Sequence, residues 1–133
     1  MPTRLVPVGD GRAVLYVAGQ VSVADGKRLT GRCPDEVSVE EAHARARITA
    51  LNVLAQIEEA AGLDNVEQVT QLFGFVLSAE GFGDQPKVLN GASDLLVDVL
   101  GEAGRHTRLA LGTNALPFSV TVEIAAVAVV RTR

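Results

Sequence analysis

The sequence predicts an α/β (α+β) fold in which two helices pack on one face of a single mixed β-sheet. Strand-like and helix-like segments follow one another in the order ββ(β)αβαββ, with one strand between the helices, which favours this layered arrangement. The 133 residues suffice for one core, so residues 1–133 are expected to form a single domain. Hydrophobic residues make up 47% of the chain and aromatic residues only 4%. The core must therefore be aliphatic, and a partner chain is expected to cover some apolar surface.

Charge and cysteine content narrow the function classes. The formal net charge is -4 and the basic residues are scattered, which opposes binding to a nucleic-acid backbone. The chain has one cysteine, Cys33, which excludes an internal disulfide. Because the only histidines are His43 and His106, neither a metal site nor another cofactor is expected. No segment has the pattern of a signal peptide or the length of a membrane span, so a cytoplasmic protein without membrane contact is expected.

The N-terminal part predicts short strands. Apolar runs at residues 5–8 and 13–20 predict two strands, joined by a glycine turn at residues 9–11. A second turn is predicted at Asp25 and Gly26, after which residues 28–30 are expected to return as a brief strand. Predicted strands therefore precede the first predicted helix in the sequence.

The first helix is predicted over residues 39–61. Ser38 and Glu41 form a capping box, in which each side chain satisfies a free backbone N–H group of the first turn. Apolar residues then recur at helical spacing, and Gly62 supplies a stop. The many alanines of this helix allow a close approach to a sheet.

The second helix follows a β-rich run at residues 66–77 and a loop at residues 78–83. Asp84 can cap this helix, and Pro86 is tolerated in its first turn. Apolar residues recur at helical spacing as far as residue 100, where glycines end the pattern. The two helices are therefore separated by a single strand.

Residues 119–130 form the clearest strand pattern, because alternate residues of a strand fall on opposite faces. Glu123 lies in its middle, on the face shared with Ala125, Val127 and Val129. A carboxylate among apolar neighbours needs a partner, since an isolated buried charge is costly. The alternative is a half-exposed glutamate at a sheet edge.

Arg108 opens the preceding strand candidate, residues 108–111, which a turn at residues 114–117 separates from the last strand. Arginine has the shape that holds a carboxylate through two parallel hydrogen bonds. His106 and Ala110 are predicted to share its side of the strand. A surface arginine and a structural histidine are the alternatives when either residue is taken alone.

Four segments, taken in order, resemble the Rid family of YjgF-type reactive intermediate deaminases, whose members are also described as endoribonuclease L-PSP-like. LYVAGQ at residues 15–20 is similar to the family's (L/V)(F/Y)VSGQ strand, with alanine for serine. Arg108 falls where the family carries its arginine, ALP at residues 115–117 matches the next turn, and VEIAAV at residues 122–127 resembles the closing VEIEAIA strand. The resemblance runs from residue 14 to residue 129, and residues 72–108 are similar to a less well defined subgroup.

The resemblance implies a chorismate-mutase-like fold and a homotrimer with clefts between its subunits. It implies that Arg108 binds the carboxylate of an enamine or imine derived from an amino acid. Glu123 would then orient or activate the water that releases a 2-oxo acid and ammonia. Backbone groups of Ala110 and Gly26 are implied as further substrate contacts, with Asn90, at the head of the second helix, as a candidate supporting residue.

Departures from the family pattern leave three functions open. The tyrosine that lines the family's cleft has no match, Leu5 or Val6 standing in its region, and His106 adds an imidazole expected to line the pocket. The first hypothesis is imine or enamine hydrolysis by Arg108 and Glu123. The second is a non-catalytic trimer that binds a small carboxylate-bearing metabolite in the same cleft. The third and weakest is endoribonuclease or translation-inhibitor activity, which the acidic balance opposes.

Overall fold

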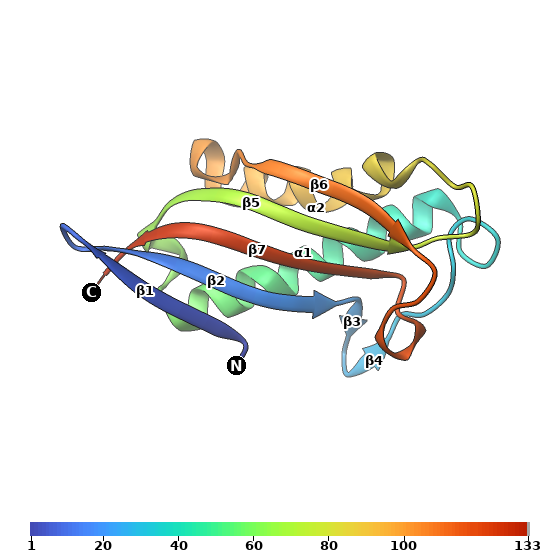
Figure 1. The fold of residues 1–133 in the computed structure, drawn as a ribbon, viewed down its shortest axis with the longest axis horizontal. Coiled ribbons are helices and arrows are strands. Elements are labelled where there is room, and N and C mark those ends of the chain that lie inside the picture. Colours follow the sequence, from blue (N-terminus) through green and yellow to red (C-terminus); the bar gives the residue numbers. More distant parts are fainter. Residues whose placement is uncertain (133) are drawn as a thin grey trace.

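The computed structural model describes residues 1–132, which form a five-stranded sheet covered on one face by two helices (Figure 1). The strands of the sheet are β1 (Thr3–Gly9), β2 (Arg12–Val21), β5 (Val66–Leu77), β6 (Thr107–Thr113) and β7 (Val122–Arg131). The helices are α1 (Val39–Ala60) and α2 (Gln85–Leu100), and a small ribbon pairs β3 (Val23–Ala24) with β4 (Lys27–Arg28). Short 3₁₀ helices lie at Leu63–Asn65, Gly101–Gly104 and Pro117–Ser119.

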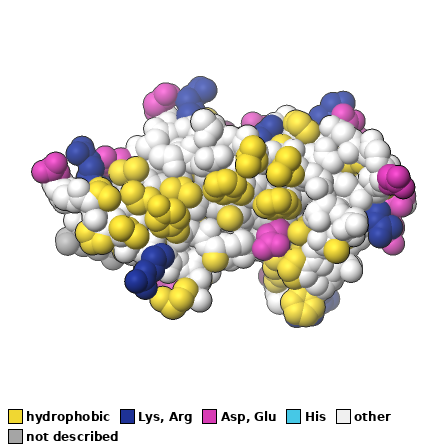
Figure 2. Space-filling model, in the orientation of Figure 1, with side chains coloured by type: hydrophobic (Ala, Val, Ile, Leu, Met, Phe, Trp, Pro, Cys, Tyr) yellow, Lys and Arg dark blue, Asp and Glu magenta, His cyan; other side chains and the backbone are white. Residues whose placement is uncertain are grey.

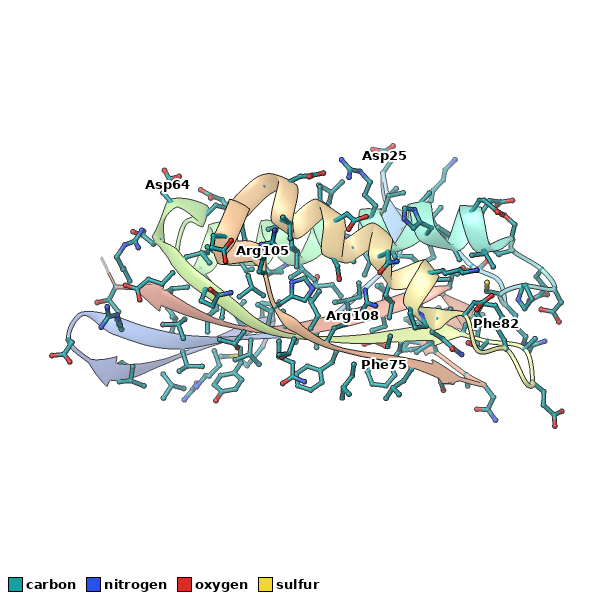
Figure 3. All side chains as sticks on the ribbon, turned by 90° about the horizontal axis from the view of Figure 1, so that it is seen from above. Asp25, Asp64, Phe75, Phe82, Arg105 and Arg108 are labelled. Carbon is teal, nitrogen blue, oxygen red and sulfur yellow. The ribbon has the colours of Figure 1, made fainter. Side chains whose placement is uncertain are left out.

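The sheet is mixed, with the strand order β1-β2-β7-β5-β6. β5 and β6 run parallel, joined by a crossover that contains α2, and all other neighbouring strands of the sheet are antiparallel. β7 therefore lies at the centre, and β6 is an edge strand. Both helices lie on the same side of the sheet (Figure 3), which confirms the predicted arrangement. We call the side away from the helices the open face.

The core between helices and sheet is aliphatic, as the composition predicts. Alternate residues of β7 are buried against the helices, and those between them are half-buried on the open face. Half of the predicted capping box is present at the start of α1, where Ser38 Oγ accepts a hydrogen bond of 3.0 Å from the backbone N–H of Glu41. The carboxylate of Glu41 lies 3.7 Å from the guanidinium of Arg45 and does not return a bond to Ser38. The helices also approach closely, since a Cβ at Gly91 would lie 2.2 Å from the carbonyl oxygen of His43.

The last strand begins later than predicted. It starts at Val122 rather than at residue 119, because residues 117–119 form a 3₁₀ turn. Phe118 and Ser119 adopt left-handed backbone angles there, with φ of 55° and 59°, and a strand cannot contain such angles. The strand predicted at residues 108–111 is in turn longer, spanning Thr107–Thr113.

Two smaller predictions also change. The brief strand expected at residues 28–30 is Lys27–Arg28, which pairs with Val23–Ala24 across the predicted turn. Asp84 does precede α2, but its side chain makes no capping hydrogen bond. Its carboxylate lies 3.9 Å from the amine of Lys87 instead, so an exposed ion pair replaces the predicted cap.

The open face carries exposed apolar side chains, which appear as a broad yellow area in Figure 2. Tyr16 of β2 is 49% exposed, and Leu109 and Leu111 of β6 are 43% and 45% exposed. Such a surface is typical of a site that another molecule covers. Among the helices of residues 1–132, none has the length and apolar character needed to cross a membrane.

Candidate functional site

Arg108 lies on β6 with its side chain directed toward α2, on the helix-covered side of the sheet (Figure 3). Its Nη1 donates to Asn90 Oδ1 at 2.9 Å and to Ser93 Oγ at 3.1 Å. These two residues are three apart on α2 and so lie on one face of the helix. Nε and Nη2 make no hydrogen bond within residues 1–132. One end of the guanidinium is thus fixed, and the other can take an anion.

His106 stands just before β6 and connects this strand to α2. Its Nδ1 lies 2.6 Å from the carbonyl oxygen of Gly104, and its Nε2 lies 2.8 Å from Ser93 Oγ. Because a carbonyl oxygen only accepts, Nδ1 carries the hydrogen and Nε2 accepts the hydroxyl hydrogen of Ser93. Burial lowers the pKa of His106 and the charge of Arg108 lowers it further, against the opposing effect of the Gly104 hydrogen bond. The imidazole is therefore neutral at neutral pH.

These side chains border a surface hollow of about 440 Å³, lined by Ser93, Asp94, Val97, Arg105, His106 and Arg108. Gln68 of β5 donates to the backbone carbonyl of Arg105 and holds the turn that leads into β6. The guanidinium of Arg105 pairs with Glu102 at 3.1 Å. Arg108 has no ion-pair partner among residues 1–132. Its guanidinium therefore gives the hollow a positive charge that no carboxylate of the described residues neutralises.

Glu123 lies on the open face of β7, half-buried, in a second hollow of about 460 Å³. Gly19, Phe75, Gly112, Thr113, Leu116 and Ala125 complete its lining. No lysine or arginine of residues 1–132 forms an ion pair with the carboxylate. Glu123 is therefore half-exposed, as in the alternative interpretation, although it lies on the central strand and not at a sheet edge. A partner for its carboxylate is not found within the described part of the chain.

Gly19 makes room for this carboxylate. The pairing of β2 with β7 is irregular between Val17 and Gln20, where the strand bulges. A Cβ at Gly19 would lie 2.1 Å from Glu123 Oε2 and 3.0 Å from its Cδ. The glutamate side chain therefore lies over the backbone of β2 at a place that only glycine leaves open.

Arg108 and Glu123 face opposite sides of the sheet within one chain. Arg108 pairs with Leu72 of β5, and Glu123 pairs with Phe75 of the same strand. Residues three apart on a strand point to opposite faces. In Figure 3 the side chain of Arg108 lies between sheet and helix, whereas that of Phe75 lies on the other side. The prediction that Arg108 and Glu123 share one cleft therefore requires a second chain.

The other predicted site residues divide in the same way. Asn90 and His106 lie beside Arg108, and Ala110 shares their side of β6, opposite Gly74 of β5. Gly26 lies in the turn between β3 and β4, in a different hollow that has no lining residue in common with the one at Arg108. Within residues 1–132, no three His, Cys, Asp or Glu side chains gather closely enough to hold a metal ion.

Sequence reasoning missed Ser93 and the role of Gly19. Ser93 lies three residues after Asn90 on a predicted helix, and that spacing could have placed both on the face of Arg108. Its partner His106 is brought to it by the 3₁₀ turn at Gly101–Gly104, which no pattern in the sequence indicates. In the sequence, Gly19 stands out only as part of a strand motif.

Comparison with known proteins agrees with this fold. Residues 7–128 match the family model described as "YjgF/chorismate mutase-like, putative endoribonuclease". Protein TCP17 of Trypanosoma cruzi is 44% identical over 113 residues, which cover 83% of this chain and 71% of that protein.

Two solved structures are also similar. The protein Atu1372 of Agrobacterium tumefaciens, of unknown function, is 39% identical with a TM-score of 0.89, over 98% of this chain and 80% of that one. A "putative endoribonuclease" of Shewanella oneidensis is 30% identical with a TM-score of 0.86, over 96% and 83%. From the family match and these relatives, the chain belongs to the Rid (YjgF/chorismate-mutase-like) family.

Proposed function

We propose that the protein binds small carboxylate-bearing metabolites at Arg108, in a cleft between the protomers of a homotrimer. It hydrolyses the imines or enamines of amino acids there to 2-oxo acids and ammonia. The observation that carries the proposal is the hydrogen bonding of the Arg108 guanidinium. Asn90 and Ser93 hold Nη1, while Nε and Nη2 stay unbonded within residues 1–132. A guanidinium held in this way is preorganised for a carboxylate that accepts two hydrogen bonds.

The second half of the cleft is assigned to a neighbouring protomer. Glu123 of the same chain lies on the opposite face of the sheet from Arg108. A homotrimer that buries the open face would carry this carboxylate toward the edge strand β6 of the next protomer. The exposed apolar side chains of Tyr16, Leu109 and Leu111 support such burial.

The proposed reaction adds water across the imine carbon–nitrogen bond. The carboxylate of the neighbouring Glu123 accepts a proton from water as the oxygen attacks the imine carbon, and it passes this proton to the nitrogen. Glu123 then carries the remaining hydroxyl proton to the same nitrogen as the carbon–nitrogen bond breaks, so that ammonia leaves and the carbonyl of the 2-oxo acid forms. One imine and one water thus give one 2-oxo acid and one ammonia, and general acid–base help of this kind is typically worth about 10²–10⁴-fold.

An imine-hydrolysis assay tests this proposal. Imines are generated in place from several amino acids by an amino-acid oxidase, and the release of 2-oxo acid is compared with buffer. Arg108→Ala and Glu123→Gln should each remove the acceleration, whereas Arg47→Ala, on the exposed side of α1, should retain it. If no imine reacts faster with the wild-type protein than in buffer, the catalytic proposal is wrong.

A non-catalytic trimer with the same ligand preference is the second candidate. The observation that favours it is the lack of the family's tyrosine, since the exposed apolar residues Leu5 and Val6 of β1 stand in its region of the sequence. A thermal-shift screen with 2-oxo acids and amino acids distinguishes the two candidates. Stabilisation that Arg108→Ala abolishes, without turnover, supports pure binding; a screen in which no carboxylate stabilises the protein contradicts both candidates.

Nucleic acid is not a proposed partner, although some relatives are described as endoribonucleases. The net charge of -4 opposes the counterion release that drives binding to phosphate backbones. RNA cleavage by highly purified protein, lost in Glu123→Ala, would overturn this assignment.

A further inference from the structure

We propose that Ser93 and His106 form a nucleophile–base pair, and that the hollow beside Arg108 accepts a small carboxylic ester. The acyl group of the ester passes first to Ser93 and then to water. This activity goes beyond imine hydrolysis, because it uses neither Glu123 nor any residue of a neighbouring protomer.

The geometry of the pair carries the proposal. The Ser93 hydroxyl donates to Nε2 of His106 at 2.8 Å, and Nδ1 of the same ring donates to the Gly104 carbonyl at 2.6 Å. A hydroxyl, a base and an acceptor that orients the base, in series, are the arrangement that activates a serine nucleophile. Here the orienting acceptor is a carbonyl, which fixes the tautomer but stabilises the imidazolium less than a carboxylate does.

The position of Ser93 on its helix sets it apart from an ordinary helical serine. A serine inside a helix usually faces solvent or turns its hydroxyl back to a carbonyl of the previous turn. Within residues 1–132 the hydrogen-bond partners of Ser93 Oγ are His106 and Arg108, both outside α2. Ser93 is half-buried and lines the hollow of about 440 Å³, so a small molecule can reach it.

Arg108 completes the site electrostatically. Its Nη1 lies 3.1 Å from Ser93 Oγ, where a positive charge stabilises the negative charge that develops on the attacking oxygen. Nε and Nη2, unbonded within the described residues, can donate to the oxyanion of the tetrahedral intermediate. The burial that lowers the pKa of His106 keeps the imidazole neutral and able to accept the proton.

Ester hydrolysis at Ser93 proceeds through acylation and then deacylation. As Ser93 Oγ attacks the ester carbon, His106 Nε2 takes the hydroxyl proton, and it then passes this proton to the alkoxide that leaves. Water next attacks the acyl-serine, His106 takes a proton from it, and that proton returns to Ser93 Oγ as the acid leaves. One ester and one water give one acid and one alcohol.

Covalent labelling tests the nucleophile directly. The wild-type protein is incubated with a fluorophosphonate, and the labelled residue is identified by peptide mass spectrometry; 4-nitrophenyl acetate hydrolysis is followed in parallel. We expect one adduct per chain, at Ser93. No adduct, or an adduct confined to another residue, would mean that Ser93 and His106 serve only to fasten β6 to α2.

Substitutions then separate the two members of the pair. Ser93→Ala should reduce ester hydrolysis to the rate in buffer, and His106→Gln should slow it about 10²–10⁴-fold by removing the base. Ser119→Ala, at an exposed serine, and His43→Gln, at the other histidine, should leave it unchanged. Hydrolysis that persists in Ser93→Ala contradicts the proposal.

The Ser93→Cys variant gives a readout that does not depend on the loss of an activity, which misfolding could also cause. A second variant separates this activity from imine hydrolysis. Cys33 is fully buried, so iodoacetamide should react with Ser93→Cys far faster than with the wild-type protein, and His106→Gln should slow that reaction. Glu123→Gln, which should abolish imine hydrolysis, should leave both ester hydrolysis and the alkylation of Ser93→Cys unchanged, because Glu123 lies on the opposite face of the sheet. Alkylation of Ser93→Cys no faster than that of an unfolded cysteine peptide, with or without His106, would overturn the activated pair whatever the imine assay gives.

Discussion

Replacing Gly19 with alanine should move the Glu123 carboxylate while leaving the fold in place. The new Cβ would lie 2.1 Å from Oε2, against an ordinary contact distance of about 3.5 Å, so the carboxylate must move by roughly 1 Å or more. The backbone of Gly19 is not left-handed, and the obstacle is the end of a rotatable side chain. We therefore expect a loss in unfolding free energy of only about 0.5–1.5 kcal/mol, but an imine-hydrolysis rate about 10²-fold lower.

Urea unfolding followed by circular dichroism measures the first quantity, and the oxidase-coupled imine assay measures the second. Gly83→Ala is the matched control, because no atom lies within 4 Å of a Cβ at that position; it should change neither quantity. Full activity of Gly19→Ala would contradict the expected role of the Glu123 carboxylate. A loss of several kcal/mol of unfolding free energy would also contradict it, since the strand and not the carboxylate would then have moved.

Arg108→Ala should weaken 2-oxo acid binding about 10- to 150-fold, because hydrogen bonds to a charged group contribute about 1.5–3 kcal/mol; unchanged affinity in isothermal titration would place the anion site elsewhere. Leu89→Ala removes a side chain that is 1% exposed and packs on Gly74, so urea unfolding should reveal a loss of about 2–5 kcal/mol; a loss below about 1 kcal/mol contradicts this packing. The lowered pKa of His106 means that the unfolded chain takes up its proton first. The stability that depends on neutral His106 is therefore complete above about pH 6.5 and is lost as the pH falls further. Charged groups around this ring are Arg105, Arg108 and Asp94, and His106→Gln should flatten the thermal-unfolding profile below pH 6.5; an unaltered profile would contradict the assignment.

The fold was predictable because its signals are local. The capping box at Ser38, the helical spacing of apolar residues and the period-two pattern around Glu123 each depend on a few adjacent residues. Where local preference fails, the prediction fails as well. Phe118 and Ser119 take left-handed angles that their side chains disfavour, so the start of β7 was predicted too early.

The site was less predictable because it depends on strand register. Alternation tells which residues of one strand share a face, but it does not relate β6 to β7. That relation passes through β5, where Arg108 pairs with Leu72 and Glu123 with Phe75, and it places the two residues on opposite faces. Ser93 was missed for a similar reason, since its contact with His106 depends on the path of the turn between α2 and β6.

The central claim is that one cleft takes Arg108 from one protomer and Glu123 from the next. Arg108→Ala and Glu123→Gln chains, each inactive alone, are co-expressed with different tags, and the oligomers that carry both tags are purified. In a cyclic trimer every mixed assembly contains one cleft with both residues intact, so about one third of wild-type imine hydrolysis should return. Mixed oligomers as inactive as either parent, beside an active wild-type protein, would contradict a cleft shared between protomers.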